Sequence, residues 1–372
     1  MYGGSVHRNP FALAALAASA VPGLVPARTT ALPAVVEGLE RAGVIAEDGR
    51  RAIVTAPTTA AAGASLEREL HVSDALLGTS LRALLPPVLG TVRLPEGGRA
   101  VVTDAPVGAP LAADAVAASA QLARSLGQAV ARIHAVPRYA AEAAGVETFT
   151  AATLRHGHRE RFERAEAENL LPSAVAQRWR HLLADDDLWD FSPQFVHGDL
   201  SDEVLFMDGD RVTGVIGWSQ ASVGDPAEDL AWLIASLDPE TFDDLYESYR
   251  REIPTLPHRR LVERAQALGE FALLRWMLHG LDIGDEEIIA DGREMLSDLD
   301  EDLIRLARSE AERAYDELTD ADDPVVDGQP SHARTSTHVP QDYTNPDAQD
   351  DSGASDELDV ADAPDVTAPP NR

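Results

Sequence analysis

The hydrophobic pattern of the first hundred residues predicts a mixed α/β region. Arg51–Ala56 is a short run rich in β-branched residues, which is typical of a strand. Val88–Leu94 and Arg99–Asp104 flank the tetrapeptide Pro-Glu-Gly-Gly, so these two segments are expected to form a hairpin. Helices are expected over Leu32–Arg41, which a glycine follows two residues later, and from Ser65 to about Leu85.

The apolar stretch Phe11–Ala20 has two interpretations. It is short and follows Arg8, as the hydrophobic region of a secretion signal follows a basic residue. It consists mostly of alanine, however, and alanine is the strongest helix former. Asn9 can cap a helix and Pro10 can occupy its first turn. An ordinary first helix is therefore expected, and a secretion signal is the alternative.

After Pro106 the pattern becomes helical. In Ala118–Val136, apolar residues recur at helical spacing and lie on one face; they are Leu122, Leu126, Val130 and Ile133. Further helical segments continue to about residue 184 and resume up to about residue 315, with strands and turns between them over Phe195–Trp218. The pattern predicts an α+β, bilobal protein with a small sheet-bearing N-lobe (residues 1–105) and a larger helical C-lobe (residues 106–315).

The composition changes at about Asp316. Residues 316–372 contain 15 Asp and Glu residues against two Arg and are otherwise rich in small residues and proline, which predicts a disordered acidic tail. The whole chain has a formal net charge of −32, which argues against nucleic acid as a partner because phosphate contacts require a basic surface. No apolar run is long enough for a membrane helix, so no membrane partner is expected.

Two residue types are missing from the chain. The sequence contains no cysteine, which excludes disulfides and thiolate metal sites and is consistent with a cytoplasmic protein. It also contains no lysine, so all 31 basic residues are arginine. This excludes every mechanism that requires a lysine, including a P-loop, a Schiff base and the usual strand lysine of a kinase.

Residues able to carry chemistry are concentrated in the island of strands and turns. It begins with FVHGDLSDEVLF (residues 195–206), continues to VIGW (residues 215–218) and is followed by GDPAEDLAW (residues 224–232). Two short strands joined by a turn are expected to place the His-Gly-Asp loop close to residues 217–218.

This ordered set of motifs resembles the aminoglycoside and macrolide phosphotransferase family. Members carry H-G-D-L-x-x-x-N, then a hairpin, then I-D-W and finally G-D-P-x-x-D-L-A. The resemblance is specific over Phe195–Leu233 and looser over Arg51–Leu303. It implies a protein-kinase-like fold and the transfer of a phosphoryl group from ATP or GTP, with Mg²⁺, to a hydroxyl group of a small molecule.

The resemblance also implies roles for individual residues. Asp199 would be the catalytic base, and His197 would brace its loop through hydrogen bonds. Asp225 would either anchor the loop from behind or, as we favour, have a structural role as a helix cap before Pro226. The nucleotide base would be recognised through the main chain of the lobe connection, at Thr103, Asp104 and Ala105.

Three positions depart from the family pattern, and each departure removes a charge or a ligand. Val204 stands where the family has a metal-binding asparagine, and Gly217 stands where it has a metal-binding aspartate. The strand that should carry the phosphate-binding cation has Thr55 at the expected place. Arg50 and Arg51 precede it but lie near a turn, so they are expected to point elsewhere.

These losses predict a degenerate family member with weak or no phosphotransferase activity. In that case its cleft would hold a small molecule or a protein partner without catalysis. The alternative is an active ATP- or GTP-dependent kinase that uses Asp199 and acts on a small hydroxylated molecule, cationic or neutral. Asp202 and Glu203 would then be replacement metal ligands, because carboxylates bind magnesium, and an arginine from elsewhere would bind phosphate.

Overall fold

The computed structural model describes residues 7–33 and 37–321 of the 372-residue chain. The chain divides into two units, Met1–Tyr315 and Asp316–Arg372, and the fold described below is that of the first unit. The boundary expected between residues 105 and 106 stays a prediction, because both lobes belong to this unit. Residues 316–321 continue the last helix, and the rest of the predicted tail lies outside the described residues.

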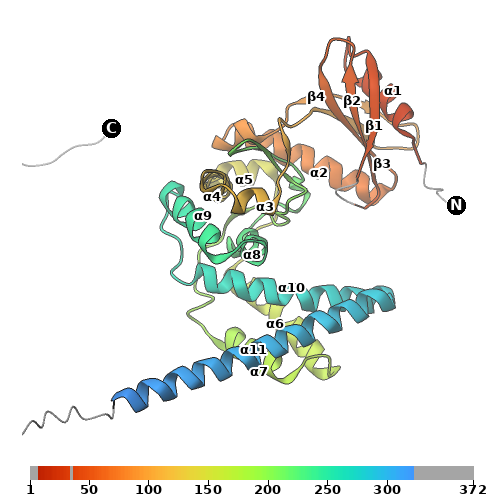
Figure 1. Ribbon diagram of the computed structural model, residues 1–372. Coiled ribbons are helices and arrows are strands. Elements are labelled where there is room, and N and C mark those ends of the chain that lie inside the picture. Colours follow the sequence, from red (N-terminus) through yellow and green to blue (C-terminus); the bar gives the residue numbers. More distant parts are fainter. Residues whose placement is uncertain (1–6, 34–36, 322–372) are drawn as a thin grey trace, which may run out of the picture. The chain divides into compact units, whose positions relative to one another are not determined.

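The N-lobe is built on a five-stranded antiparallel sheet (Figure 1). The strands lie in the order β1-β2-β3-β5-β4, with bounds β1 (Pro26–Leu32), β2 (Leu39–Ala46), β3 (Arg51–Pro57), β4 (Val88–Arg93) and β5 (Arg99–Asp104). Side chains alternate between the two faces of a strand. One face is buried against helix α1 (Pro10–Ala20), and the opposite face lines a cavity described below.

Helix α1 forms where an ordinary first helix was expected. Asn9 accepts a hydrogen bond from the backbone N–H of Ala12, and Pro10 occupies the first position of the helix. The helix buries Leu13 and Ala17 against the sheet. The cap and the position of the proline follow directly from the local sequence.

Two helix predictions in the N-lobe need correction. The two ends of the segment Leu32–Arg41 are not helical, because they belong to the paired strands β1 and β2; residues 34–36 lie outside the described residues. Its Leu, Ala and Glu residues favour a helix, but pairing of β2 with both β1 and β3 overrides this weak preference. The next helix, α2 (Ala60–Leu76), begins before Ser65 because Thr59 caps it. It ends well before Leu85, and a short 3₁₀ helix, η1 (Ser80–Leu84), follows.

The C-lobe is a set of helices around one core, which includes the predicted apolar stripe of α4. The helices are α3 (Ala113–Ala117), α4 (Ala120–His134), α5 (Arg138–Ala144), α6 (Ala151–Ala167), α7 (Ser173–Ala184), α8 (Ala227–Ser236), α9 (Pro239–Glu252), α10 (Leu261–Ile283) and α11 (Glu286–Ala321). At Gly127 in α4, an added Cβ would lie 2.2 Å from the carbonyl oxygen of Leu245 in α9. Only glycine therefore permits this close crossing of the two helices.

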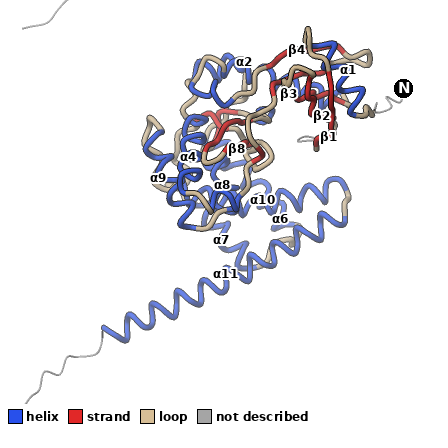
Figure 2. Tube along the Cα trace, turned by 45° about the horizontal axis from the view of Figure 1, so that its top comes forward, coloured by secondary structure: helices blue, strands red, loops and turns tan. Residues whose placement is uncertain are grey.

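Short strands interrupt the helices of the C-lobe, as the sequence pattern predicts. They form two small sheets, β10-β7 and β6-β8-β9, and Figure 2 shows strand β8 among the helices, apart from the N-lobe sheet. The bounds are β6 (Ala109–Pro110), β7 (Gln194–Val196), β8 (Leu205–Asp208), β9 (Arg211–Val215) and β10 (Ser222–Gly224), with a 3₁₀ turn η2 (Trp218–Gln220). The hairpin β8–β9 brings residue 216 back to residue 204, where Ile216 N–H donates to the Val204 carbonyl.

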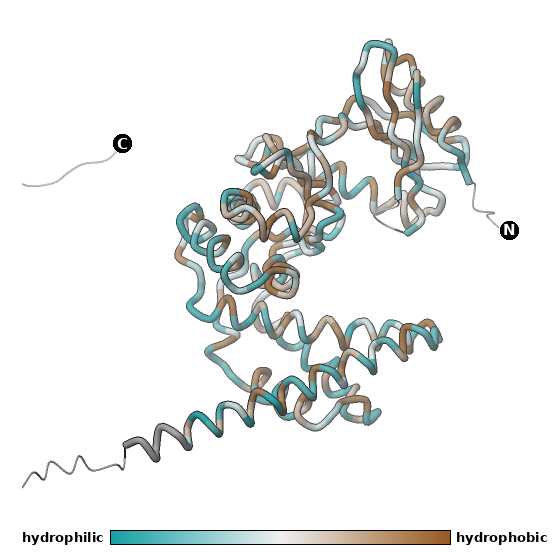
Figure 3. Tube along the Cα trace, in the orientation of Figure 1, coloured by the Kyte–Doolittle hydropathy of each residue, from teal (hydrophilic) through white to brown (hydrophobic). Residues whose placement is uncertain are grey.

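Hydrophobic and hydrophilic residues alternate along the long helix α11 (Figure 3). Ile289 and Leu296 are buried, whereas Leu306 is half exposed. Among the described residues, no helix combines the length and the apolar character that a membrane span requires.

Candidate functional site

The loop 197–204 follows β7 and is braced by a fully buried histidine. His197 Nε2 lies 2.8 Å from the carbonyl oxygen of Ile216. Because a carbonyl oxygen only accepts, Nε2 is the donor, and Nδ1 remains to accept the backbone N–H of Asp199 at 3.4 Å. The neutral imidazole therefore ties the beginning of the loop to the end of the hairpin. The predicted proximity of this loop to residues 217–218 is confirmed.

Asp229, in the first turn of α8, anchors the same loop from behind. Its fully buried carboxylate accepts the backbone N–H groups of His197 at 2.8 Å and of Gly198 at 2.9 Å. His134 Nε2 lies 3.2 Å from the carboxylate, and the Tyr249 hydroxyl lies 2.9 Å from His134 Nδ1. Burial alone would raise the pKa of Asp229, but the hydrogen bonds from His134 and the loop hold this pKa below its ordinary value. The buried carboxylate is thus ionised.

The hydrogen bonds of the Asp225 carboxylate go to Ala227 and Arg264 and not to the loop 197–204. One carboxylate oxygen accepts the N–H of Ala227 at 2.9 Å, which caps α8, and the other accepts Nε of Arg264 at 2.6 Å. The guanidinium of Arg264 also donates to the carbonyl of Leu188 and lies over the ring of Phe191. Asp229 was not predicted to be the anchor. The signal was present, because Asp229 is the second aspartate of the same motif, one helical turn after Asp225.

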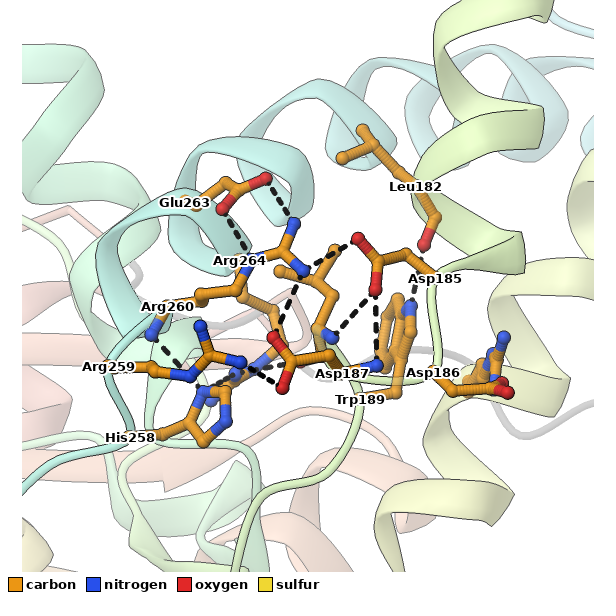
Figure 4. A network of polar contacts seen from close by, with 12 residues as sticks. Leu182, Asp185, Asp186, Asp187, Trp189, His258, Arg259, Arg260, Glu263 and Arg264 are labelled. Carbon is orange, nitrogen blue, oxygen red and sulfur yellow. Dashed lines mark hydrogen bonds and ion pairs between the residues drawn. The ribbon is translucent and has the colours of Figure 1, made fainter.

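Arg264 belongs to a polar network at the beginning of α10 (Figure 4). The neighbouring Arg260 donates to Asp185 at 2.6 Å and to Glu263, and the network also contacts Asp187. These contacts hold the segment between α7 and β7 in place, and the loop 197–204 follows directly after β7.

Asp199 is exposed and lines a cavity of about 300 Å³ together with Glu228, Trp232 and Arg275. An exposed carboxylate at this place can orient a hydroxyl group and take its proton. Burial and the neighbouring carboxylates raise the pKa of Glu228 to about 7. The cavity therefore offers the exposed carboxyl group of Asp199 and a second carboxyl group, that of Glu228, which titrates near neutrality.

The two positions that the family uses for metal ligands pack against each other. Val204 is buried, and Gly217 has a left-handed backbone conformation with φ of 83°. A Cβ on Gly217 would lie only 3.0 Å from Cγ1 of Val204, so the valine fills the space in which a side chain at residue 217 would begin. The Gly217 N–H donates to Glu69 of α2 at 2.9 Å.

These residues do not fit a magnesium site. Magnesium requires oxygen ligands in near-octahedral geometry, and neither valine nor glycine has a side-chain oxygen. In the part of the chain that the structure describes, no group of three or more His, Cys, Asp or Glu residues is placed to hold a metal ion. Asp202 and Glu203 are both exposed; Glu203 lines the large cavity described next, and Asp202 is not among its lining residues.

A larger cavity of about 530 Å³ lies under the sheet of the N-lobe. Its walls are mainly apolar, with side chains such as Ile53 and Phe206, and it also contains three arginines, Arg28, Arg41 and Arg51. Arg51 thus lines the cavity, whereas Arg50 points away and contacts Asp48 and the carbonyl of Gly23.

The three residues predicted for the nucleotide base lie at the edge of this region. Ala105 lines the large cavity and Thr103 lines an adjacent smaller one, while Asp104 is a lining residue of neither. The N–H groups of Asp104 and Ala105 already donate to the carbonyls of Pro87 and Arg51. Any main-chain contact by these two residues would therefore use their carbonyl groups.

The comparisons with known proteins agree with this geometry. The model of the phosphotransferase enzyme family matches residues 35–262. Viomycin phosphotransferase from Streptomyces vinaceus is 33% identical over 288 residues, which are 72% of this chain and 94% of that protein.

Solved structures give the same result for the fold. The macrolide 2′-phosphotransferase MphH from Brachybacterium faecium, solved as the apoenzyme, matches with a TM-score of 0.66 and 26% identity and covers 77% of this chain and 97% of its own. The GDP and kanamycin complex of an aminoglycoside 2″-phosphotransferase matches with a TM-score of 0.64 at 18% identity and covers 77% of this chain and 97% of that one. The chain is a member of the phosphotransferase enzyme family and has its kinase-like fold.

Proposed function

We propose that this protein binds ATP or GTP in the cavity of about 530 Å³ and a small molecule in the cavity that Asp199 lines, and that it transfers phosphate weakly or not at all. The observation that carries this proposal is the contact between Val204 and Gly217. It places a methyl group and a bare backbone where phosphoryl transfer requires oxygen ligands for a metal.

The expected loss in the rate of phosphoryl transfer follows from how this reaction is catalysed. Phosphoryl transfer depends almost entirely on positioning and on electrostatic stabilisation of the transferred group. Removal of a single preorganised donor from an active site lowers a rate by about 10²–10³-fold. Two ligand positions are altered together here, so a larger loss is expected even though Asp199 keeps its loop and its exposure.

Nucleotide binding is supported by the chemistry of the larger cavity. Its apolar wall suits a purine base, and three arginines supply positive charge in a chain whose net charge is −32. Neighbouring solved structures of the same fold are complexes with GDP, with ADP, or with ATP and streptomycin. The substrate class at the Asp199 cavity is a small molecule by the same analogy.

A second candidate function is an active kinase in which Glu203, with Asp202, replaces the missing metal ligands. One observation favours it, because Glu203 lines the same cavity as Arg41 and acts electrostatically on that arginine. Asp199 would remain the base in this case.

The test is phosphate transfer by the purified full chain. The protein is incubated with ATP or GTP and Mg²⁺ in the presence of viomycin, kanamycin or a macrolide, and phosphorylated products are measured by mass spectrometry. We expect little or no product above the level given by the Asp199→Asn variant. Turnover at a rate ordinary for kinases, about 1 s⁻¹ or faster, that requires both Asp199 and Mg²⁺ would overturn the proposal, and its loss in Glu203→Gln would then identify the replacement ligand.

A further inference from the structure

We propose that Arg41, on strand β2, is the cation that contacts the nucleotide phosphates in this protein. It takes the place of the basic residue missing from the neighbouring strand β3, where Thr55 stands. This inference rests on the proposed binding of a nucleotide and names the residue on which the phosphate contact depends.

The register of the sheet brings Arg41 to the required place. Strands β2 and β3 are antiparallel, and Arg41 lies directly opposite Thr55. Residues directly opposite each other in such a pair share one face of the sheet, with Cβ atoms about 5 Å apart. Ala42 and Val44 point to the other face, into the core under α1. A side chain can therefore reach the same space from residue 41 as from residue 55.

The three arginines of the cavity are not equivalent. Ile45 on β2 pairs with Arg28 on the neighbouring strand β1 and with Arg51 on the neighbouring strand β3. These two arginines therefore lie at the same end of the cavity, near Ala105. Arg41 lies four residues before Ile45 on β2, which at about 3.4 Å per residue places it about 14 Å away along the strand. At that end the cavity is also lined by Glu203 of the C-lobe loop, whose charge acts on Arg41. A nucleotide whose base lies near Ala105 therefore extends its phosphates towards Arg41.

The guanidinium of Arg41 is only weakly engaged by the protein itself. One nitrogen lies 3.4 Å from the carbonyl oxygen of Pro33, and within the described ranges it forms no ion pair. Glu69 acts on it electrostatically but uses its carboxylate to accept the N–H of Gly217. Burial lowers the pKa of Arg41, and the charges of Glu69 and Glu203 oppose this effect. A guanidinium with several free donors at a partly dry site is well suited to bidentate contact with phosphate.

This arrangement has a consequence for the role of magnesium. If Arg41 neutralises the phosphate charge, binding does not depend on a metal, in agreement with the apolar contact between Val204 and Gly217. The protein should then bind ATP or GTP with the same affinity in EDTA as in the presence of Mg²⁺.

The experiment is calorimetric titration of the full chain, in EDTA, with ATP and GTP and with adenosine and guanosine. Arg41→Ala is compared with Arg50→Ala, a matched control in which the altered arginine contacts Asp48 outside the cavity. We expect Arg41→Ala to weaken binding of the preferred triphosphate by about 10- to 100-fold, the effect of one lost charge-assisted hydrogen bond or pair. Binding of the nucleoside should not change, and Arg50→Ala should match the wild type.

A rescue variant keeps the test decisive if Arg41→Ala is poorly folded. Arg41→Ala/Thr55→Lys moves the cation back across the strand pair, and Arg41→Gln keeps most of the side-chain volume without the charge. Recovery of triphosphate affinity in the first, with loss in the second, supports the inference. Unchanged triphosphate affinity in Arg41→Gln overturns it while nucleotide binding stands. A wild-type protein that binds neither triphosphates nor nucleosides overturns the proposed nucleotide site itself.

Discussion

The two ends of the loop 197–204 differ in character although they are only a few residues apart. At its beginning, His197 and Gly198 donate backbone hydrogen bonds to the buried carboxylate of Asp229, and His197 braces the N–H of Asp199. At its end, Val204 is buried and fills the space beside Gly217. The first end is polar and fully hydrogen-bonded, whereas the second is an apolar contact.

The difference shows that the hydrogen bonds that hold this loop in place, here called the brace, do not depend on the residues at the metal-ligand positions. The hydrogen bonds of Asp229 reach through His134 to Tyr249 and so join α8, α4 and α9. They stabilise the C-lobe whether or not phosphate is transferred, because buried donors need their acceptors. The metal-ligand positions have no such structural role and can be replaced by well-packed apolar groups. Four substitutions sharpen this comparison.

The largest effect is expected for Asp229→Ala. The change removes the acceptor of three donors, of which those on His197 and His134 are buried and that on Gly198 is partly buried. At about 1–3 kcal/mol for each orphaned donor, the free energy of unfolding should fall by about 3 kcal/mol or more. Urea unfolding measures it, with Asp202→Ala as the exposed control in the same loop. A loss below about 1 kcal/mol would contradict the brace.

The next largest effect is on the pH dependence of the free energy of unfolding. It comes from Glu228, whose pKa is raised to about 7 from the ordinary 4.5. The folded state then holds a proton that the unfolded state has released, so stability is lost as pH rises between these two values. Glu228→Gln removes the titration. The variant should gain up to about 3 kcal/mol over the wild type near pH 8 and nothing near pH 4, at about 1.4 kcal/mol per unit of pKa shift. Parallel stability curves for the two proteins from pH 4 to pH 8 would show that Glu228 titrates normally.

A smaller effect is expected for Gly217→Asp. A non-glycine residue at φ of 83° is strained, and its Cβ would meet Val204 at 3.0 Å. Together these should cost about 1–3 kcal/mol in the free energy of unfolding. Gly209→Asp is the matched control, because Gly209 also has a positive φ but no atom near an added Cβ. Adding Val204→Ala to Gly217→Asp should recover stability, and an equal cost at residues 209 and 217 would exclude the clash.

The smallest effect is expected for Asp199→Asn. The side chain is exposed, and only its backbone N–H contacts the brace, so the free energy of unfolding should change by no more than about 0.5 kcal/mol. A loss close to that of Asp229→Ala would mean that the two ends of the loop are not separable in the way described.

Much of the fold could be predicted because its signals are local. The Pro-Glu-Gly-Gly turn defines the hairpin of β4 and β5, and the stripe from Leu122 to Ile133 defines α4. Leu32–Arg41 was misread because its residues favour a helix, while its ends are strands only through their pairing with neighbouring strands, which local residue preferences do not show.

The candidate site divides in the same way. The proximity of the His-Gly-Asp loop to residues 217–218 follows from a short hairpin and was predicted. The place of Arg41 was not, because it depends on the register between β2 and β3, and a shift of one residue would turn the side chain into the core. Asp229 was missed because an acidic residue in the first turn of a helix has an ordinary explanation in the helix dipole.

The close contact between Val204 and Gly217 imposes an order on any stepwise introduction of metal ligands at these two residues. An aspartate that arises first at residue 217 meets the valine, whereas a smaller residue at 204 opens the space beforehand. A laboratory selection for phosphate transfer that starts from this chain should therefore collect changes at residue 204 earlier than changes at residue 217. Lineages that begin at residue 217 should be rare, because they cross a less stable intermediate.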